Sequence, residues 1–153
     1  MPVPRSGSAL QSGMAGKPHG LIDTGAILAL LDEGDSWHRR CVETYQSLRL
    51  PLATSAAVLT ELFHLLRSPR QFAKTWGFLR SGPVTVLPIG DGDLPDLEAL
   101  MIRYSDRPMD FADATLVHLA RREELVTIFT VDHDDFETYR IEGKRRFRIV
   151  PGR

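Results

Sequence analysis

The chain has 153 residues, of which 42% are hydrophobic and 25% charged, and its formal net charge is −1. This length and composition predict one globular domain, large enough to form a core without stabilising disulfides. A single cysteine, Cys41, excludes an internal disulfide framework and is typical of a reducing compartment, so we expect a cytoplasmic protein. No apolar run approaches the roughly 20 residues of a transmembrane helix, so no membrane association is expected.

Residues 1–19 are rich in Gly, Ser and Pro and lack the apolar stretch of a secretion signal. Because such a segment has no apolar face to bury, we expect a disordered leader here. We leave open whether this leader belongs to the native gene. If it does not, Met14 is the expected native start. Residues 20–153 are expected to form the folded domain.

Short strands alternate with helices from residue 20 onward. The hydrophobic pattern predicts strands over 20–22, 50–54, 84–89, 126–131 and 147–150. It predicts helices over 24–31, 36–48, 55–66, 69–80, 94–104 and 110–124. This alternation is typical of an α/β domain with a mainly parallel central sheet. Ligands of such a sheet collect at the carboxyl ends of its strands.

Two aspartates stand directly after predicted strands. Asp23 follows the first strand, and Asp132 follows the most hydrophobic one. An aspartate in this position is often only a helix cap or a turn residue. Two strand-end carboxylates can nevertheless converge on the edge where ligands are expected.

Two further acids lie at core-facing positions of predicted helices. Asp113 shares a helical stripe with Leu116 and Val117, so its carboxylate should face the sheet. A buried carboxylate without a partner is costly and normally protonates or finds a cation. Glu61 borders the apolar face of its own helix, although an exposed helical Glu is an equally good interpretation for this residue alone. Taken together, the four carboxylates predict a site for a hard divalent cation and hydrolytic chemistry on phosphodiesters.

The segments around these acids resemble the signature segments of the PIN-domain ribonuclease family. They are Leu21-Ile22-Asp23-Thr24, Leu59-Thr60-Glu61-Leu62, Phe111-Ala112-Asp113-Ala114 and Thr130-Val131-Asp132. Each segment is weak alone, but the four occur in the family's order and at its usual spacings. The similarity is closest to the VapC toxins of type II toxin–antitoxin systems, and it covers roughly residues 20–151.

The resemblance implies a PIN-like three-layer α/β/α sandwich that cleaves RNA with Mg²⁺ or Mn²⁺. The implied metal ligands and catalytic residues are Asp23, Glu61, Asp113 and Asp132. Thr24 and Thr130 are expected to support them, while Asp110 is better explained as a helix cap and Asp135 as a residue of a solvated turn. The resemblance further implies an RNA substrate, a small antitoxin partner and a homodimer.

Two alternatives stay open at this point. An aspartyl-phosphate phosphatase or receiver-like domain also places an aspartate after its first strand. However, Gly25 stands where the phosphatase motif has a second aspartate, and no lysine follows a late strand as a receiver requires. A non-catalytic interaction module is the other alternative.

A second group of charges lies outside the acidic set. Arg67, Arg70, Lys74 and Arg80 could face RNA, but a solvated helix face is the favoured interpretation from the sequence.

Overall fold

The structure is a computed structural model that describes residues 16–153. Of the leader expected over 1–19, residues 1–15 therefore lie outside the described part. The backbone of His19 is already tied to the domain, because its N–H donates a hydrogen bond of 3.0 Å to the carbonyl of Pro51.

Five short strands form one sheet in the order β3-β2-β1-β4-β5, and every pairing in it is parallel. The strands are β1 (Leu21–Ile22), β2 (Leu52–Thr54), β3 (Val84–Val86), β4 (Thr127–Phe129) and β5 (Arg148–Val150). The chain runs outward from β1 through β2 to β3, and then returns to β4 on the other side of β1. The strand order thus reverses between β1 and β4, which is the point where parallel α/β sheets bind ligands.

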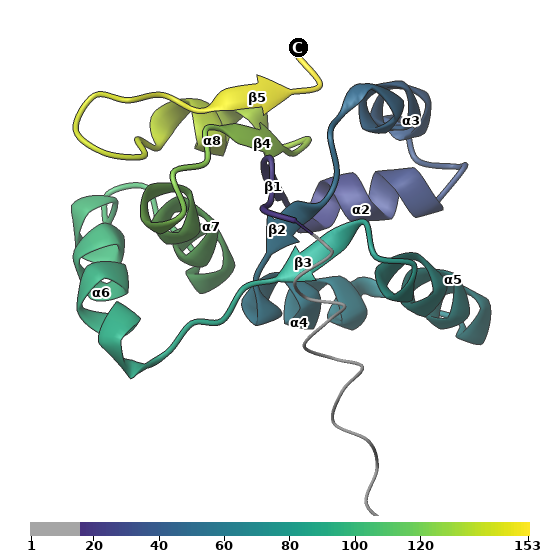
Figure 1. The fold of residues 1–153 in the computed structure, drawn as a ribbon, viewed down its shortest axis with the longest axis horizontal. Coiled ribbons are helices and arrows are strands. Elements are labelled where there is room, and N and C mark those ends of the chain that lie inside the picture. Colours follow the sequence, from purple (N-terminus) through teal and green to yellow (C-terminus); the bar gives the residue numbers. More distant parts are fainter. Residues whose placement is uncertain (1–15) are drawn as a thin grey trace, which may run out of the picture.

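Helices cover both faces of this sheet (Figure 1). They are α2 (Thr24–Leu31), α3 (His38–Ser47), α4 (Ala56–Leu65), α5 (Pro69–Arg80), α6 (Leu94–Arg103), α7 (Phe111–Arg122) and α8 (His133–Thr138), with a 3₁₀ turn η1 (Asp91–Asp93). In this view α6 and α7 lie on one side of the strands, and α2, α3 and α5 lie on the other. The expected three-layer α/β/α architecture is therefore confirmed. Between residues 16 and 153, no helix combines the length and the apolarity that crossing a bilayer requires.

The sequence missed one element that matters for the site. Asp135 was expected in a solvated turn, but it lies in α8, which begins directly after Asp132. This helix has only six residues, too few to show a helical period in the sequence. It is held by Phe136, which is buried and packs edge-on against Phe147 at a ring separation of 5.5 Å.

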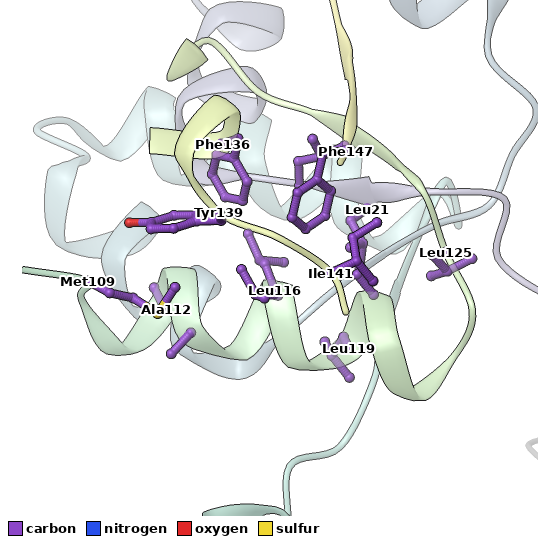
Figure 2. Packing of buried hydrophobic residues seen from close by; sticks show 14 of the residues in the cluster. Leu21, Met109, Ala112, Leu116, Leu119, Leu125, Phe136, Tyr139, Ile141 and Phe147 are labelled. Carbon is purple, nitrogen blue, oxygen red and sulfur yellow. The ribbon is translucent and has the colours of Figure 1, made fainter. Parts of the chain in front are cut away.

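A buried aromatic cluster joins the end of α8 to α7. The rings of Phe136 and Tyr139 meet edge-on at 5.3 Å, and Figure 2 shows both on the side of α7 that carries Ala112 and Leu116. Tyr139 is 1% exposed and its hydroxyl points along α7 toward the end where Met109 lies. This packing places a phenol beside the N-terminus of α7, at one side of the candidate site.

Candidate active site

One threonine connects the two strand-end aspartates. The Thr130 hydroxyl donates a hydrogen bond of 3.0 Å to Oδ2 of Asp23, and it accepts one of 3.0 Å from the backbone N–H of Asp132. Because β1 and β4 are neighbours in register, the segments that follow them stay adjacent. Thr130 thus binds one carboxylate oxygen of Asp23 and the backbone of Asp132. Asp23 and Asp132 meet at the reversal of the strand order.

Asp23 is both a helix cap and a buried acid. Its Oδ1 accepts a hydrogen bond of 2.7 Å from the N–H of Thr24, while only 7% of the residue is exposed. Burial raises the pKa of this carboxyl from 3.8 to about 6, and the charges of Glu61 and Asp132 add to the rise. Gly25 lets the start of α2 approach closely, since a Cβ there would lie 2.7 Å from the side chain of Val131.

Glu61 reaches the same centre from α4. It is half-buried, and its charge acts on Asp23. The Thr24 hydroxyl contacts the carbonyl of Val58 on α4 at 3.4 Å, which ties the start of α2 to the helix that carries Glu61. Thr24 therefore supports the site through its backbone N–H and through α4, while its hydroxyl is directed away from Asp23.

Asp113 is the most strongly perturbed carboxyl of the group. It lies in the first turn of α7 and is 9% exposed, and Asp110 caps this helix by accepting a hydrogen bond of 2.7 Å from the Asp113 N–H. Burial, followed by the charges of Asp23 and Asp110, raises its pKa from 3.8 to about 8. The Tyr139 hydroxyl donates a hydrogen bond of 3.0 Å to Oδ2 of Asp113 and opposes part of this rise.

Asp132 and Asp135 close the site on the side of α8. Oδ1 of Asp132 caps α8 by accepting a hydrogen bond of 3.2 Å from the Asp135 N–H, and burial together with the Asp135 carboxylate raises the pKa of Asp132. Arg107, from the loop before α7, pairs with Asp135 at 3.0 Å and donates a hydrogen bond of 2.8 Å to the Thr138 hydroxyl. Asp135 is thus partly neutralised by an arginine.

The four predicted acids have no such neutralising partner. None of the ion pairs between residues 16 and 153 includes Asp23, Glu61, Asp113 or Asp132; the pairs involve other acids, such as Asp135 with Arg107. Unpaired carboxylates whose charges raise the pKa of Asp23 and of Asp113 form a region where a cation would be strongly favoured.

These residues fit a magnesium or manganese ion by their chemistry. Across the described part of the chain, no three His, Cys, Asp or Glu side chains are gathered closely enough to ligate one ion together. This arrangement is compatible with Mg²⁺, which commonly takes one or two protein carboxylates and keeps waters and substrate oxygens as its other ligands. Asp23 and Asp113 are the buried members of the group, and the more open Asp132 and Glu61 complete an all-oxygen donor set.

Two residues of this region were missed from the sequence. Tyr139 lies 26 positions from Asp113, in a stretch whose helix was itself not predicted, so no local pattern connected the two. Arg107 was not singled out from the sequence, because its pairing with Asp135 depends on where α8 begins. Only a three-dimensional arrangement reveals either contact.

Comparisons with known proteins agree with this architecture. A family model described as PIN domain matches residues 20–142. Ribonuclease VapC26 of Mycobacterium tuberculosis is 29% identical over 134 residues, which span 86% of this chain and 99% of that protein.

Two solved structures share the fold. The crystal structure of Mycobacterium tuberculosis VapC20, described as a toxin that cleaves the sarcin–ricin loop, aligns with a TM-score of 0.69 and 22% identity over 82% of this chain and 98% of that one. The structure of FitAB bound to a DNA fragment aligns with a TM-score of 0.57 and 20% identity over 76% of this chain and 87% of that one.

Proposed function

Because the chain belongs to the PIN-domain family, we propose that it is a metal-dependent endoribonuclease that hydrolyses phosphodiester bonds of RNA. The similarity to ribonuclease VapC26 over nearly the whole length of that protein supports RNA as the substrate. The acidic centre supports the dependence on Mg²⁺ or Mn²⁺, since its carboxylates have no protein cation to balance them.

The proposal rests most directly on the environment of the Asp113 carboxyl. Its carboxyl is buried at the first turn of α7, its pKa is raised to about 8, and no arginine, lysine or histidine pairs with it within residues 16–153. A buried acid that serves only the fold normally recruits a cationic side chain. With a pKa of about 8 the metal-free Asp113 carboxyl instead holds a proton at pH 7, and a bound divalent cation would take the place of that proton.

The residues of the acidic centre would then have different roles. Asp23, Asp113, Asp132 and Glu61 would hold the cation, one or two of them directly and the others through its water ligands. When bound, the cation would stabilise charge on the phosphate and make an attacking water more acidic. The N–H of Thr24 and the hydroxyl of Thr130 fix the two oxygens of Asp23. Burial and the nearby charge of Asp113 raise the pKa of Tyr139, so its hydroxyl keeps its proton and continues to orient the Asp113 carboxylate.

The proposal includes a toxin role with protein partners. The relatives named VapC and the FitAB complex support a cognate antitoxin. We further propose a homodimer and a cytoplasmic location, as the resemblance of the sequence to the toxin family implies. Coexpression with the product of a short neighbouring reading frame, followed by copurification, tests the antitoxin. Light scattering at high protein concentration tests the dimer.

The rival functions meet specific difficulties. The phosphatase reading lacks its second acid, because position 25 is a glycine that packs against Val131 and leaves no room for a side chain. The receiver reading requires a lysine beside the phosphorylated aspartate, and the ion pairs within residues 16–153 place no lysine at Asp23.

The decisive assay is cleavage of a pool of single-stranded and hairpin RNAs by the purified chain. We expect cleavage with Mg²⁺ or Mn²⁺, none with EDTA, and weak support by Ca²⁺, whose larger and looser shell positions water less well. Asp23→Asn should abolish cleavage, whereas Asp134→Asn, the same change of charge on the exposed side of α8, should not. Full activity after exhaustive removal of metal would refute the proposal.

A further inference from the structure

Helix α5 carries an exposed surface that the cleavage site does not use. Phe72 and Trp76 lie one helical turn apart and are 40% and 52% exposed. Both rings pack against Phe63 of α4, at 5.9 Å and 4.8 Å between ring centroids. We call Phe63, Phe72 and Trp76 with the neighbouring Arg70 and Arg80 the α5 surface. Leaving two adjacent aromatic rings exposed to water is unfavourable in free energy, so such a surface often marks a binding site.

The charges around these rings are of one sign. Between residues 62 and 80 every formally charged side chain is basic: Arg67, Arg70, Lys74 and Arg80. In the described part of the chain none of these four forms an ion pair with a carboxylate, although arginines elsewhere do, for example Arg107 with Asp135. Helix α5 thus carries basic residues and no acid, in a chain whose net charge is −1.

The rings and the cations share one exposed arc of the helix. Arg80 stands one turn beyond Trp76, and Arg70 lies across the exposed small residues Ala73 and Gly77 from the rings. A side chain added at Gly77 would meet no other atom, so a ligand can approach the backbone there.

From this arrangement we infer that the α5 surface binds unpaired RNA, with bases stacked on Trp76 and Phe72 and a backbone phosphate held by Arg80. Proteins that bind single strands combine aromatic stacking with a track of cations in this way. Duplex RNA fits less well, because its bases are already stacked and are not available to the rings. The identity of the ligand as RNA rests on the proposed function.

A second copy of the chain is a poorer occupant. Docking this face on itself would bring the basic residues of both α5 helices together, and α5 contains no acid to balance them. On the Arg70 side of α5, a cavity of about 610 Å³ is lined by Asp32, Glu33 and Asp35 together with Arg70 and Lys74. Because these carboxylates repel phosphate, the RNA backbone is expected on the Arg80 side of the helix.

Helix α4 connects the α5 surface to the cleavage centre. It carries Glu61 toward Asp23 and, two residues later and on another face, Phe63 beneath the exposed rings. An RNA strand that leaves the centre can therefore follow α4 to α5. The α5 surface would hold nucleotides away from the bond that is cut, and so contribute to the choice of RNA.

The experiment measures binding of the full chain to a short fluorescein-labelled RNA without self-complementarity, by anisotropy in EDTA. Binding is thereby read without cleavage, so a failure of the proposed nuclease activity and a failure of this inference remain distinguishable. The chain has two tryptophans, and a Trp37→Phe background leaves Trp76 as the single one. RNA should quench its fluorescence, because a stacked base contacts the indole directly.

Trp76→Leu keeps an apolar side chain but removes the stacking surface, and should weaken RNA binding about tenfold. Arg70→Ala with Arg80→Ala should weaken binding and reduce its salt dependence. Lys144→Ala with Arg145→Ala removes the same charge from an exposed loop outside α5 and is the control.

Unchanged affinity of Trp76→Leu, or equal losses in the two charge-removal pairs, would overturn the inference. A loss of affinity accompanied by dissociation of an oligomer in sedimentation would also overturn it, since the surface would then join protein subunits.

Discussion

The two ends of α7 hold aspartates in opposite electrostatic states. At its N-terminus Asp113 is surrounded by other carboxylates, and its pKa is raised to about 8. Near its C-terminus Asp93 of η1 accepts hydrogen bonds from the Gly90 N–H at 2.8 Å and from Nε2 of His118 at 2.7 Å, and pairs with Arg122 at 3.3 Å. These partners lower the pKa of Asp93 to about 2.

The difference separates a structural acid from a functional one. Asp93 is provided with donors and a cation by the protein itself, and it joins η1 to α7. Asp113 receives one neutral donor, Tyr139, while its other close neighbours are acids. An arrangement that destabilises a carboxylate in the free protein is characteristic of a site completed by a ligand.

The largest expected effect is a difference in RNA cleavage between substitutions at the two ends of α7. Asp113→Asn should lower RNA cleavage by more than about a hundredfold, beyond the roughly 10–100-fold loss typical of a residue that only supports a metal ligand. Asp93→Asn makes the same chemical change at the other end of the helix and should leave cleavage nearly intact. Equal losses in both variants, with both folded by circular dichroism, would remove the distinction.

The next expected effect is on the pH dependence of stability. The folded pKa of Asp113 lies near 8 and that of Asp23 near 6, both above 3.8, so protons are bound more tightly in the folded state. The stability that this provides is full below pH 4 and is lost as the pH rises, up to about 6 for Asp23 and about 8 for Asp113. The metal-free Asp113→Asn variant should therefore melt several degrees above the original chain at pH 8, and the difference should shrink toward pH 4.

Asp93 should show the reverse behaviour. Its lowered pKa provides stability that is present above pH 4 and lost as the pH falls through about 2. Mg²⁺ should raise the melting temperature of the original chain at pH 8 and raise that of Asp113→Asn less, because the ion binds only the folded centre. If the metal-free Asp113→Asn variant melts several degrees lower at pH 8, Asp113 is a structural cap.

A smaller effect is expected near the C-terminus of α7, where Asp93 is paired with His118 and Arg122. His118 is 5% exposed and donates to Asp93, so His118→Ala should lower the free energy of unfolding by about 1–3 kcal/mol while cleavage remains. His118→Gln, which keeps a donor, should recover part of the loss. Urea unfolding of the two variants measures both values. A fall in cleavage at full stability would contradict the structural role.

The smallest effect is expected from Tyr139→Phe. Without the phenol the pKa of Asp113 rises further, because this hydrogen bond lowers it. Protons then compete better with the cation, and the Mg²⁺ concentration for half-maximal cleavage at pH 7 should rise by less than about tenfold. The difference should vanish well above pH 8. A loss that is independent of pH would instead indicate damage to the aromatic cluster.

Much of this comparison was accessible from the sequence, and some of it was not. Strand ends and helical stripes predicted the α/β class and brought Asp23, Asp113 and Asp132 to one edge, because these signals are local and periodic. Helix α8 was missed because it is shorter than two turns. Because α8 was not predicted, the contacts of Tyr139 with Asp113 and of Arg107 with Asp135 could not be inferred. These contacts join residues 26 and 28 positions apart.

The expectation for α5 shows a different limit. Helical positions placed Arg70 and Arg80 on a solvated face, and they are exposed. The periodic pattern did not predict that Phe72 and Trp76 remain exposed as well, since aromatic residues in an amphipathic helix are normally assigned to the core. Their exposure depends on how α5 packs against α2 and α4, which is a tertiary property.

The central claim is that the acidic centre lacks a cation in the protein and is completed by a divalent metal ion. A carbon-detected NMR titration of the Asp113 carboxyl, with and without Mg²⁺, measures this most directly. We expect a pKa of about 8 in the metal-free protein, lowered by more than about one unit when Mg²⁺ is added. A metal-free pKa near 4, or one that Mg²⁺ leaves unchanged, would contradict the account.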